Sequence, residues 1–321
     1  MILRSTRDRN GPAAAPGHRG LRVQRPSAQR RRAAPPPTCR AAGASGAPAG
    51  AAAPRRPAGA AALGVFVCSG STAVAEALAV SGLDFVVIDA QHGAVSYRSL
   101  HDLLAATWGR GAKRIVRVGG PDDAYGMQQA LDLGADGVMV PLVYTRADAA
   151  RAVAACKYAP AGRRSVAYPV RAVYSKGAGP AALAEYLRTA NDETEVWVQV
   201  ETKECFEDID NVLSVPGIHC AFLGPADLGV AHGLHVAADY SLGKMLATPE
   251  VGAFYTRVLA ACRRARVAAG AFCLGRARAA ELAAMGYDYV GFDTDLNALI
   301  TTAQAAVAEI SGSGGGGGGA A

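Results

Sequence analysis

Short apolar runs alternate with longer Ala- and Leu-rich stretches between Leu63 and Ile310. The run DFVVID at residues 84–89 is typical of the first kind. It is β-branched and stops abruptly at polar residues, which indicates a strand buried on both faces. STAVAEALAVSG, with Ser71 or Thr72 as the N-cap and Gly82 as the stop, is typical of the second kind and predicts a helix.

Eight apolar runs of this kind predict eight strands, with helices between them and after the last. The expected strands are residues 64–68, 84–89, 113–118, 137–143, 195–201, 220–224, 268–274 and 287–293. One long irregular connection is expected from Ala159 to about Ala181. Eight repeats over about 250 residues predict an α/β protein with a (β/α)8 TIM barrel at residues 61–311. A doubly wound sheet is the alternative, but no GxGxxG follows the first strand.

The two ends of the chain have a different composition. Residues 1–60 contain 12 arginines and the single acid Asp8, together with many Ala, Pro and Gly residues. We expect this leader to be disordered, and its Arg-rich, acid-poor composition favours a transit peptide for a chloroplast or mitochondrion. The alternatives are that the leader is an unstructured extension or that the start of the chain is wrongly assigned. In either case we expect the protein to be cytoplasmic. Residues 312–321 predict a flexible Gly-rich tail.

The net charge of +6 resides in the leader. The rest of the chain has 21 basic and 26 acidic side chains, a balance of −5. A basic folded face is therefore not expected, which argues against a nucleic-acid partner. No apolar run approaches the roughly 18–20 residues of a membrane span, so no membrane association is expected. The seven scattered cysteines lack CxxC spacing and favour reduced thiols.

Polar side chains follow four of the expected strands at the points where these strands end. They are Asp89 and His92 after the second strand, Arg117 at the third, Gln199 and Glu201 at the fifth, and Asp227 after the sixth. In a (β/α)8 barrel the active site lies at the carboxyl ends of the strands. The four strand ends therefore predict one site.

Glu201 and Asp227 are candidate ligands of a hard divalent cation. Two carboxylates from neighbouring strands suit Mg²⁺ or Mn²⁺, with Co²⁺ as a further candidate, and leave coordination positions for substrate and water. The alternative is that they are ordinary strand-end acids in salt bridges. Zinc is disfavoured because no His or Cys lies at ligand spacing, and His232 and His235 are expected to be exposed in a loop.

Arg117 and His92 are candidate catalytic groups. A guanidinium inside a ring of small residues needs an anion, either a bound carboxylate or a developing enolate. The alternative is an ion pair with an Asp or Glu of the chain. His92 can exchange protons near neutral pH, and we expect Asp89 to fix its tautomer. Lys113 and Lys203 are poorly placed for Schiff-base chemistry, which favours a metal-stabilised enolate.

The segments DAQHG, VRV, LDLGADGVMVPLV, KYAPAGRRS, VQVET and FLGPADLG resemble, in this order, the HpcH/HpaI aldolase family. The family comprises class II metal-dependent pyruvate aldolases such as 4-hydroxy-2-oxoheptanedioate aldolase and 2-dehydro-3-deoxyglucarate aldolase. The resemblance covers roughly residues 64–308. It implies a (β/α)8 barrel, Mg²⁺ or Mn²⁺, and a homohexamer built from dimers that exchange a C-terminal helix.

The resemblance also implies a reaction, the cleavage of a 4-hydroxy-2-oxo acid to pyruvate and an aldehyde through a metal-stabilised enolate. It implies these roles: metal ligands Glu201 and Asp227, substrate contacts Gln199 and Ala226, general base His92, enolate-stabilising Arg117, and Asp132 as the acid that raises the basicity of the histidine. Asp132 is expected at the opposite rim of its own barrel, so this role implies action across a subunit interface.

The chain departs from the family pattern in two places. No helix is predicted before the first strand, and KYAPAGRRS has Ala159 and Ser165 where the family has proline and glycine. We expect this connection to shape the substrate mouth. One alternative function is an acyl-CoA lyase of the citrate lyase β or malyl-CoA lyase type, which would want a basic cluster that the sequence lacks. Another is a non-catalytic 2-oxo-acid-binding barrel, which would not need to keep all four candidate side chains.

Overall fold

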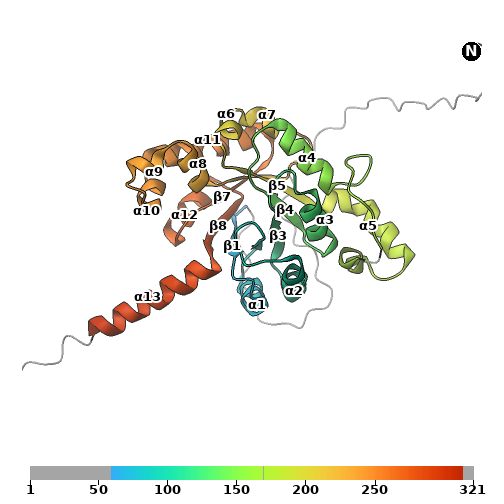
Figure 1. Cartoon of the computed structure of the whole chain (residues 1–321), viewed down its shortest axis with the longest axis horizontal. Coiled ribbons are helices and arrows are strands. Elements are labelled where there is room, and N and C mark those ends of the chain that lie inside the picture. Colours follow the sequence, from blue (N-terminus) through green and yellow to red (C-terminus); the bar gives the residue numbers. More distant parts are fainter. Residues whose placement is uncertain (1–58, 169, 314–321) are drawn as a thin grey trace, which may run out of the picture. The chain divides into compact units, whose positions relative to one another are not determined.

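The computed structural model describes residues 59–168 and 170–313, so the predictions for the leader and for most of the tail lie outside the described residues. Eight parallel strands form a closed barrel in the order β1 to β8 (Figure 1). The predicted (β/α)8 barrel is confirmed and the doubly wound alternative is wrong. The strands are β1 Ala62–Val67, β2 Phe85–Asp89, β3 Lys113–Arg117, β4 Gly137–Val140, β5 Glu195–Val200, β6 Cys220–Leu223, β7 Ala268–Phe272 and β8 Tyr289–Thr294.

Helices follow the strands around the barrel. They are α1 Thr72–Val80, α2 Tyr97–Thr107, α3 Ala124–Asp132, α4 Arg146–Cys156, α5 Pro180–Glu193, α6 Lys203–Glu207, α7 Ile209–Leu213, α8 Pro225–Ala231, α9 Leu234–Ala237, α10 Leu242–Leu246, α11 Pro249–Ala265, α12 Arg276–Met285 and α13 Asp295–Ser313, with the 3-10 helix η1 at Arg171–Lys176. Ser71 is the N-cap of α1, as predicted, since its hydroxyl accepts a hydrogen bond from Val74 N.

The alternation of side chains along each strand divides the core into two layers. The inner layer fills the barrel with large side chains, namely Phe66, Phe85, Val87, Ile115, Met139, Trp197, Cys220, Phe222 and Tyr289. Glycines make room for the rings. A Cβ on Gly64 would approach the Phe85 ring to 2.4 Å, and one on Gly270 would approach the Phe222 ring to the same distance. The barrel below the rim is therefore a solid core.

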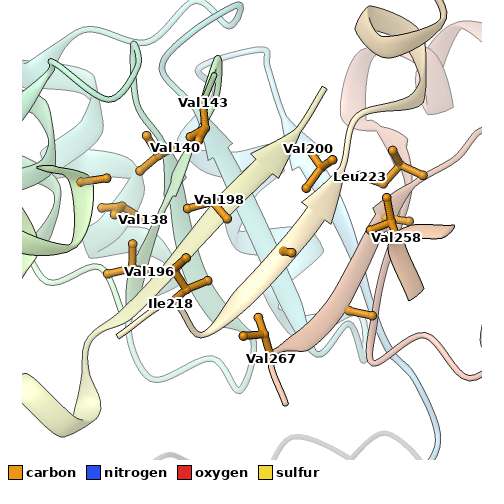
Figure 2. Packing of buried hydrophobic residues seen from close by; sticks show 14 of the residues in the cluster. Val138, Val140, Val143, Val196, Val198, Val200, Ile218, Leu223, Val258 and Val267 are labelled. Atoms are coloured by element: carbon orange, nitrogen blue, oxygen red, sulfur yellow. The ribbon is translucent and has the colours of Figure 1, made fainter. Parts of the chain in front are cut away.

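The outer layer packs the strands against the helices. Figure 2 shows part of it, where Val138 and Val140 of β4 alternate with inward residues, as do Val196, Val198 and Val200 of β5. All of these side chains are fully buried. Burial of a Val side chain stabilises a fold by roughly 1.5–3 kcal/mol, so this layer holds the strand ends at fixed positions.

The connection between α4 and α5 lies on the amino-terminal side of the barrel. α4 begins at the carboxyl-terminal rim and ends at Cys156, so the chain leaves it on the opposite side. There Arg164 Nη2 donates to Asp132 Oδ1 at 2.6 Å, at the end of α3. The expectation that this connection shapes the substrate mouth is therefore wrong within its own barrel, because the chain leaves α4 on the side opposite the carboxyl-terminal rim.

The last helix, α13, has little contact with the barrel. All side chains from Thr301 to Ser311 are exposed, among them Val307 and Ile310 at 64% and 73%. Figure 1 shows α13 running out beyond β8. In the part of the chain that the structure describes, no helix is long and apolar enough to cross a membrane.

Candidate active site

Four of the predicted site residues, Asp89, Arg117, Gln199 and Glu201, lie on the inward side of their strands, at or just after the strand ends. On β5, Trp197 points into the barrel core and the alternation places Gln199 and Glu201 above it on the same side. In the same way Asp89 follows Val87 on β2, and Arg117 follows Ile115 on β3. The alternation of side chains along the strands therefore brings these polar groups to one rim, above the apolar inner layer.

Arg117 and Asp89 form a two-point ion pair between β3 and β2. Arg117 Nε donates to Asp89 Oδ1 at 2.9 Å, and Nη2 donates to Oδ2. Burial opposes ionisation of Asp89, but the hydrogen bonds and charge of Arg117 outweigh it and hold the pKa of the carboxyl below its ordinary value. The alternative of an ion pair within the chain is thus what the structure contains, and this pair aims the guanidinium at the rim.

His92 lies exposed in the turn that follows β2. Asp89 Oδ1 accepts hydrogen bonds from the backbone amides of Gln91 and His92, at 3.1 and 3.2 Å. The described contacts of this carboxylate are with amides, with Arg117 and with the Cys68 thiol, not with the imidazole. Asp89 therefore positions the backbone of His92, and the expected control of the tautomer has no support in these contacts.

Glu201 is a carboxylate buried at the centre of the rim, only 3% exposed. Its Oε1 accepts from Leu142 N at 2.9 Å and its Oε2 from Gln199 Nε2 at 2.9 Å. Burial, and to a smaller degree the neighbouring Asp227 charge, raises the pKa of Glu201 to about 7, against the Leu142 hydrogen bond and the Arg117 charge. An anionic Glu201 therefore needs further positive charge beside it.

Asp227 and Ala226 lie in the first turn of α8, after β6. The Asp227 side chain is exposed, and its charge acts on Glu201, as does that of Arg117. Gly224 precedes this turn, and a Cβ there would lie 2.5 Å from Glu201 Oε2. The glycine thus leaves open the space in which the Glu201 carboxylate sits.

The residues present fit a hard divalent cation. Glu201 and Asp227 offer oxygen ligands, and the buried Gln199 Oε1 has no hydrogen-bond partner among the described residues. Within residues 59–168 and 170–313, no three His, Cys, Asp or Glu side chains form a metal-binding group. Two carboxylates suit Mg²⁺ or Mn²⁺, which keep several positions for water and substrate, better than a closed zinc site.

Asp132 is not brought to this rim. It ends α3 on the opposite side, where its carboxylate pairs with Arg164 and is nearly buried. The Arg164 guanidinium lies 4.7 Å from the centre of the Tyr158 ring. The single chain therefore shows Asp132 in a buried ion pair, and its role across an interface stays a prediction.

Lys113 lies at the amino end of its strand, as expected, and Lys203 lies at the start of α6. Lys113 begins β3 and pairs with Glu195 at the first position of β5, far below the rim, and Lys203 is exposed. His232 follows the last residue of α8 and His235 lies in α9; both are half-buried, so the expectation that they are exposed is wrong. His232 lies against the Phe206 and Phe254 rings, which explains its burial.

Sequence reasoning missed two positioning groups at the rim. Leu142 has a left-handed backbone (φ 55°), which directs its amide to Glu201. Asp295 accepts hydrogen bonds from the amides of Cys68 and Ser69, which ties the start of α13 to the loop after β1. The sequence could not have predicted the role of Leu142, because leucine rarely adopts a left-handed backbone conformation. Asp295 could have been found, because it follows the last predicted strand in the same way as the other acids at strand ends follow theirs.

The comparisons with known proteins identify the family of the chain. The family model described as HpcH/HpaI aldolase/citrate lyase matches residues 62–302. A hydroxypyruvate/pyruvate aldolase of Agrobacterium fabrum is 30% identical over 250 residues, which is 78% of this chain and 89% of the relative. A 2-keto-3-deoxy-L-rhamnonate aldolase of Salmonella gallinarum is 30% identical over 233 residues, 73% of this chain and 82% of the relative.

A solved structure has the same fold. The HpcH/HpaI aldolase/citrate lyase family protein from Burkholderia cenocepacia superposes with a TM-score of 0.70 at 32% identity, and the match covers 79% of this chain and 96% of that one. The family model, the relatives and this structure agree over nearly the whole barrel. The chain therefore belongs to the HpcH/HpaI aldolase/citrate lyase family and is a carbon–carbon lyase of the aldolase type.

Proposed function

We propose that the protein cleaves a 4-hydroxy-2-oxo acid to pyruvate and an aldehyde. The observation that carries this proposal is the convergence of a buried carboxylate, Glu201, with Asp227 and the Arg117 guanidinium at one rim. Such a site binds the two oxygens of a 2-oxo acid and stabilises the charge that develops when the carbon–carbon bond breaks. The relatives named as hydroxypyruvate/pyruvate aldolase and 2-keto-3-deoxy-L-rhamnonate aldolase support the same reaction class.

Glu201 and Asp227 would hold Mg²⁺ or Mn²⁺. When bound, the cation supplies Lewis-acid polarisation of the 2-oxo and carboxylate oxygens of the substrate. Gln199 would contact the substrate beside Glu201, and Ala226 would lie against it from the turn of α8. Gln199 Nε2 already donates to Glu201, so this amide also holds the carboxylate in place.

The bond cleavage requires one proton to leave and one to be added. We assign His92 to remove the proton of the 4-hydroxyl, directly or through a water. The oxygen electrons then form the aldehyde carbonyl, the bond between carbons 3 and 4 breaks, and its electron pair enters the pyruvate enolate. The positive charge of Arg117 stabilises the enolate oxygen, and the ion pair with Asp89 orients the Arg117 guanidinium for this contact. Protonation of carbon 3 releases pyruvate.

We further propose that the functional unit is a homo-oligomer in which α13 docks on a neighbouring subunit. The supporting observation is the run of exposed apolar side chains on α13: Leu296, Leu299, Ile300, Val307 and Ile310. An oligomer would also give Asp132 a neighbouring active site to act on. The double substitution Val307→Asp and Ile310→Asp is expected to lower the molar mass measured by light scattering to that of a smaller assembly. An unchanged mass would refute docking through this face.

The test of the reaction is pyruvate release coupled to lactate dehydrogenase, with 4-hydroxy-2-oxo acids of several chain lengths. We expect pyruvate with Mn²⁺ and none with excess EDTA. A folded protein that binds Mn²⁺ but releases no pyruvate from any of these acids would refute the proposal. Formation of acetyl-CoA and a 2-oxo acid from a hydroxyacyl-CoA such as malyl-CoA would then assign the acyl-CoA lyase reaction, and the absence of both reactions would assign a non-catalytic barrel.

A further inference from the structure

A pocket of about 370 Å³ lies beside the site, between the loops that follow β3 and β4. Its lining includes Gly119, Pro121, Asp122, Asp123, Leu142 and Tyr144. The volume is at the lower end of the range for small-molecule pockets and suits a fragment of a few carbon atoms. Pro121, Leu142 and Tyr144 offer apolar surface to such a fragment.

The pocket wall and the centre of the site form one hydrogen-bonded unit. Leu142 lines the pocket, and its amide donates to Glu201 Oε1 at 2.9 Å. The left-handed backbone of Leu142 makes this contact, so the wall is fixed relative to the carboxylate. Gly119, on the other wall, follows Arg117 by two positions. A substrate held between Arg117 and Glu201 therefore has this pocket as an adjoining space.

The pocket is unsuited to an anion. The amino ends of α3 and α4, which would attract a negative group, are already occupied by carboxylates of the chain. Asp123 Oδ1 accepts from Gly126 N at 2.8 Å, and Asp148 Oδ2 accepts from Thr145 N at 2.8 Å. Asp122 adds a third negative charge, and Arg151, which pairs with both Asp122 and Asp148, is the one cation in these contacts. Three carboxylates, with one guanidinium and the partial positive charges of two helix ends against them, leave an excess of negative charge on this wall.

We propose that this pocket receives the aldehyde portion of the substrate and selects uncharged aldehydes over those that carry a distal carboxylate, sulfonate or phosphate. The inference rests on the proposed aldolase function and adds the substrate class to it. Asp122 is its specificity-determining residue, since this side chain is exposed, caps no helix and contacts none of the catalytic residues in the described part of the chain.

The test compares two substrates that differ only at the far end. They are 4-hydroxy-2-oxoheptanoate, which ends in a methyl group, and 4-hydroxy-2-oxoheptanedioate, which ends in a carboxylate. We expect kcat/KM for pyruvate release by the full chain with Mn²⁺ to be about tenfold higher for the first, from like-charge repulsion at about 4–6 Å in a solvated pocket. The preference is expected to shrink in 0.5 M KCl, because salt screens exposed charges.

Asp122→Lys reverses the charge at the pocket and is expected to shift the ratio of the two kcat/KM values at least tenfold toward the dicarboxylate. Asp210→Lys is the matched control, since Asp210 is also exposed and paired with an arginine, Arg264, but lies near the amino ends of the strands. For Asp210→Lys, the ratio of the two kcat/KM values is expected to stay within about twofold of the wild-type ratio. Equal kcat/KM for the two acids, or a ratio that Asp122→Lys leaves unchanged, overturns this inference alone. No pyruvate from either acid overturns the proposed function and this inference with it.

Discussion

Replacement of Glu201 by glutamine tests the physical basis of the metal site without any substrate. The carboxylate is buried, both of its oxygens accept hydrogen bonds, and burial raises its pKa from an ordinary 4.5 to about 7. In the metal-free protein, ionised Glu201 is therefore a cost to the fold. Glutamine has nearly the same shape and is neutral at every pH, so it keeps the packing and removes this cost.

The magnitude follows from the pKa. The difference between 4.5 and about 7, at about 1.4 kcal/mol per pH unit, amounts to roughly 3 kcal/mol. The folded state binds the extra proton between these two values. The stabilisation is therefore fully present below about pH 4.5 and is lost as the pH rises to about 7. At pH 8 the metal-free variant is expected to be more stable than the wild type by about 1–3 kcal/mol, with the gap closing toward pH 5.

The assay is urea unfolding of EDTA-treated protein, followed by circular dichroism between pH 5 and pH 8. Mn²⁺ binding, followed by the electron paramagnetic resonance signal of free Mn²⁺, is the second measurement. The wild type is expected to gain stability from Mn²⁺ at pH 8 and to lose affinity as the pH falls below about 7, because the proton competes for Glu201. Glu201→Gln is expected to abolish binding while the protein stays folded.

Two results would refute this reasoning. Parallel stability curves for wild type and variant from pH 5 to pH 8 would show that Glu201 ionises without cost in the folded protein. Unfolding of the variant under conditions in which the wild type is stable would show that Glu201 is a structural residue. Gln199→Glu serves as a control for the site, since it adds a charge beside Glu201 and is expected to steepen the loss of stability with rising pH.

Three further predictions concern neighbouring groups. Arg117→Lys cannot keep a two-point contact and is expected to lower kcat for pyruvate release at least about 100-fold while Mn²⁺ affinity stays within about threefold, and an equal loss of both would contradict a role at the enolate. Gly224→Ala would place a Cβ 2.5 Å from Glu201 Oε2, so Mn²⁺ affinity should fall at least about tenfold in a protein with an unchanged circular dichroism spectrum. Asp132→Asn leaves the buried Arg164 uncompensated and is expected to lower the free energy of unfolding by about 3 kcal/mol in urea titrations, and a change below about 1 kcal/mol would show that water reaches the pair.

The barrel could be predicted from the sequence because its pattern is local. Strands such as β2 and β6 are buried along their whole length and consist almost entirely of apolar residues, and helices such as α1 begin at a residue whose side chain caps them, as Ser71 does. The site residues followed from the same pattern, since a polar group at the end of a buried run lies at the rim of a parallel barrel. Glu201, Asp227 and Arg117 were found in this way, and the rim places all three close enough to act on one another.

The resemblance supplied what the pattern could not. Asp132 ends a helix of mixed polarity, and nothing in its surroundings in the sequence marks it as functional. The structure gives it a partner, Arg164, which lies 32 residues further along the chain. A buried ion pair across such a separation has no periodic signature, because it depends on how two connections pack rather than on the period of either.

The sequence by itself determined which residues stand at the rim, because the two-residue period of a strand and the direction of a parallel barrel fix the position of each strand end. Only the tertiary structure decided what those residues contact. Asp89 holds amides and Arg117 rather than the imidazole of His92, and the left-handed Leu142 supplies a hydrogen bond to Glu201. The period of a strand is a property of the local chain, whereas these contacts join side chains and amides from different strands and exist only after the barrel has closed.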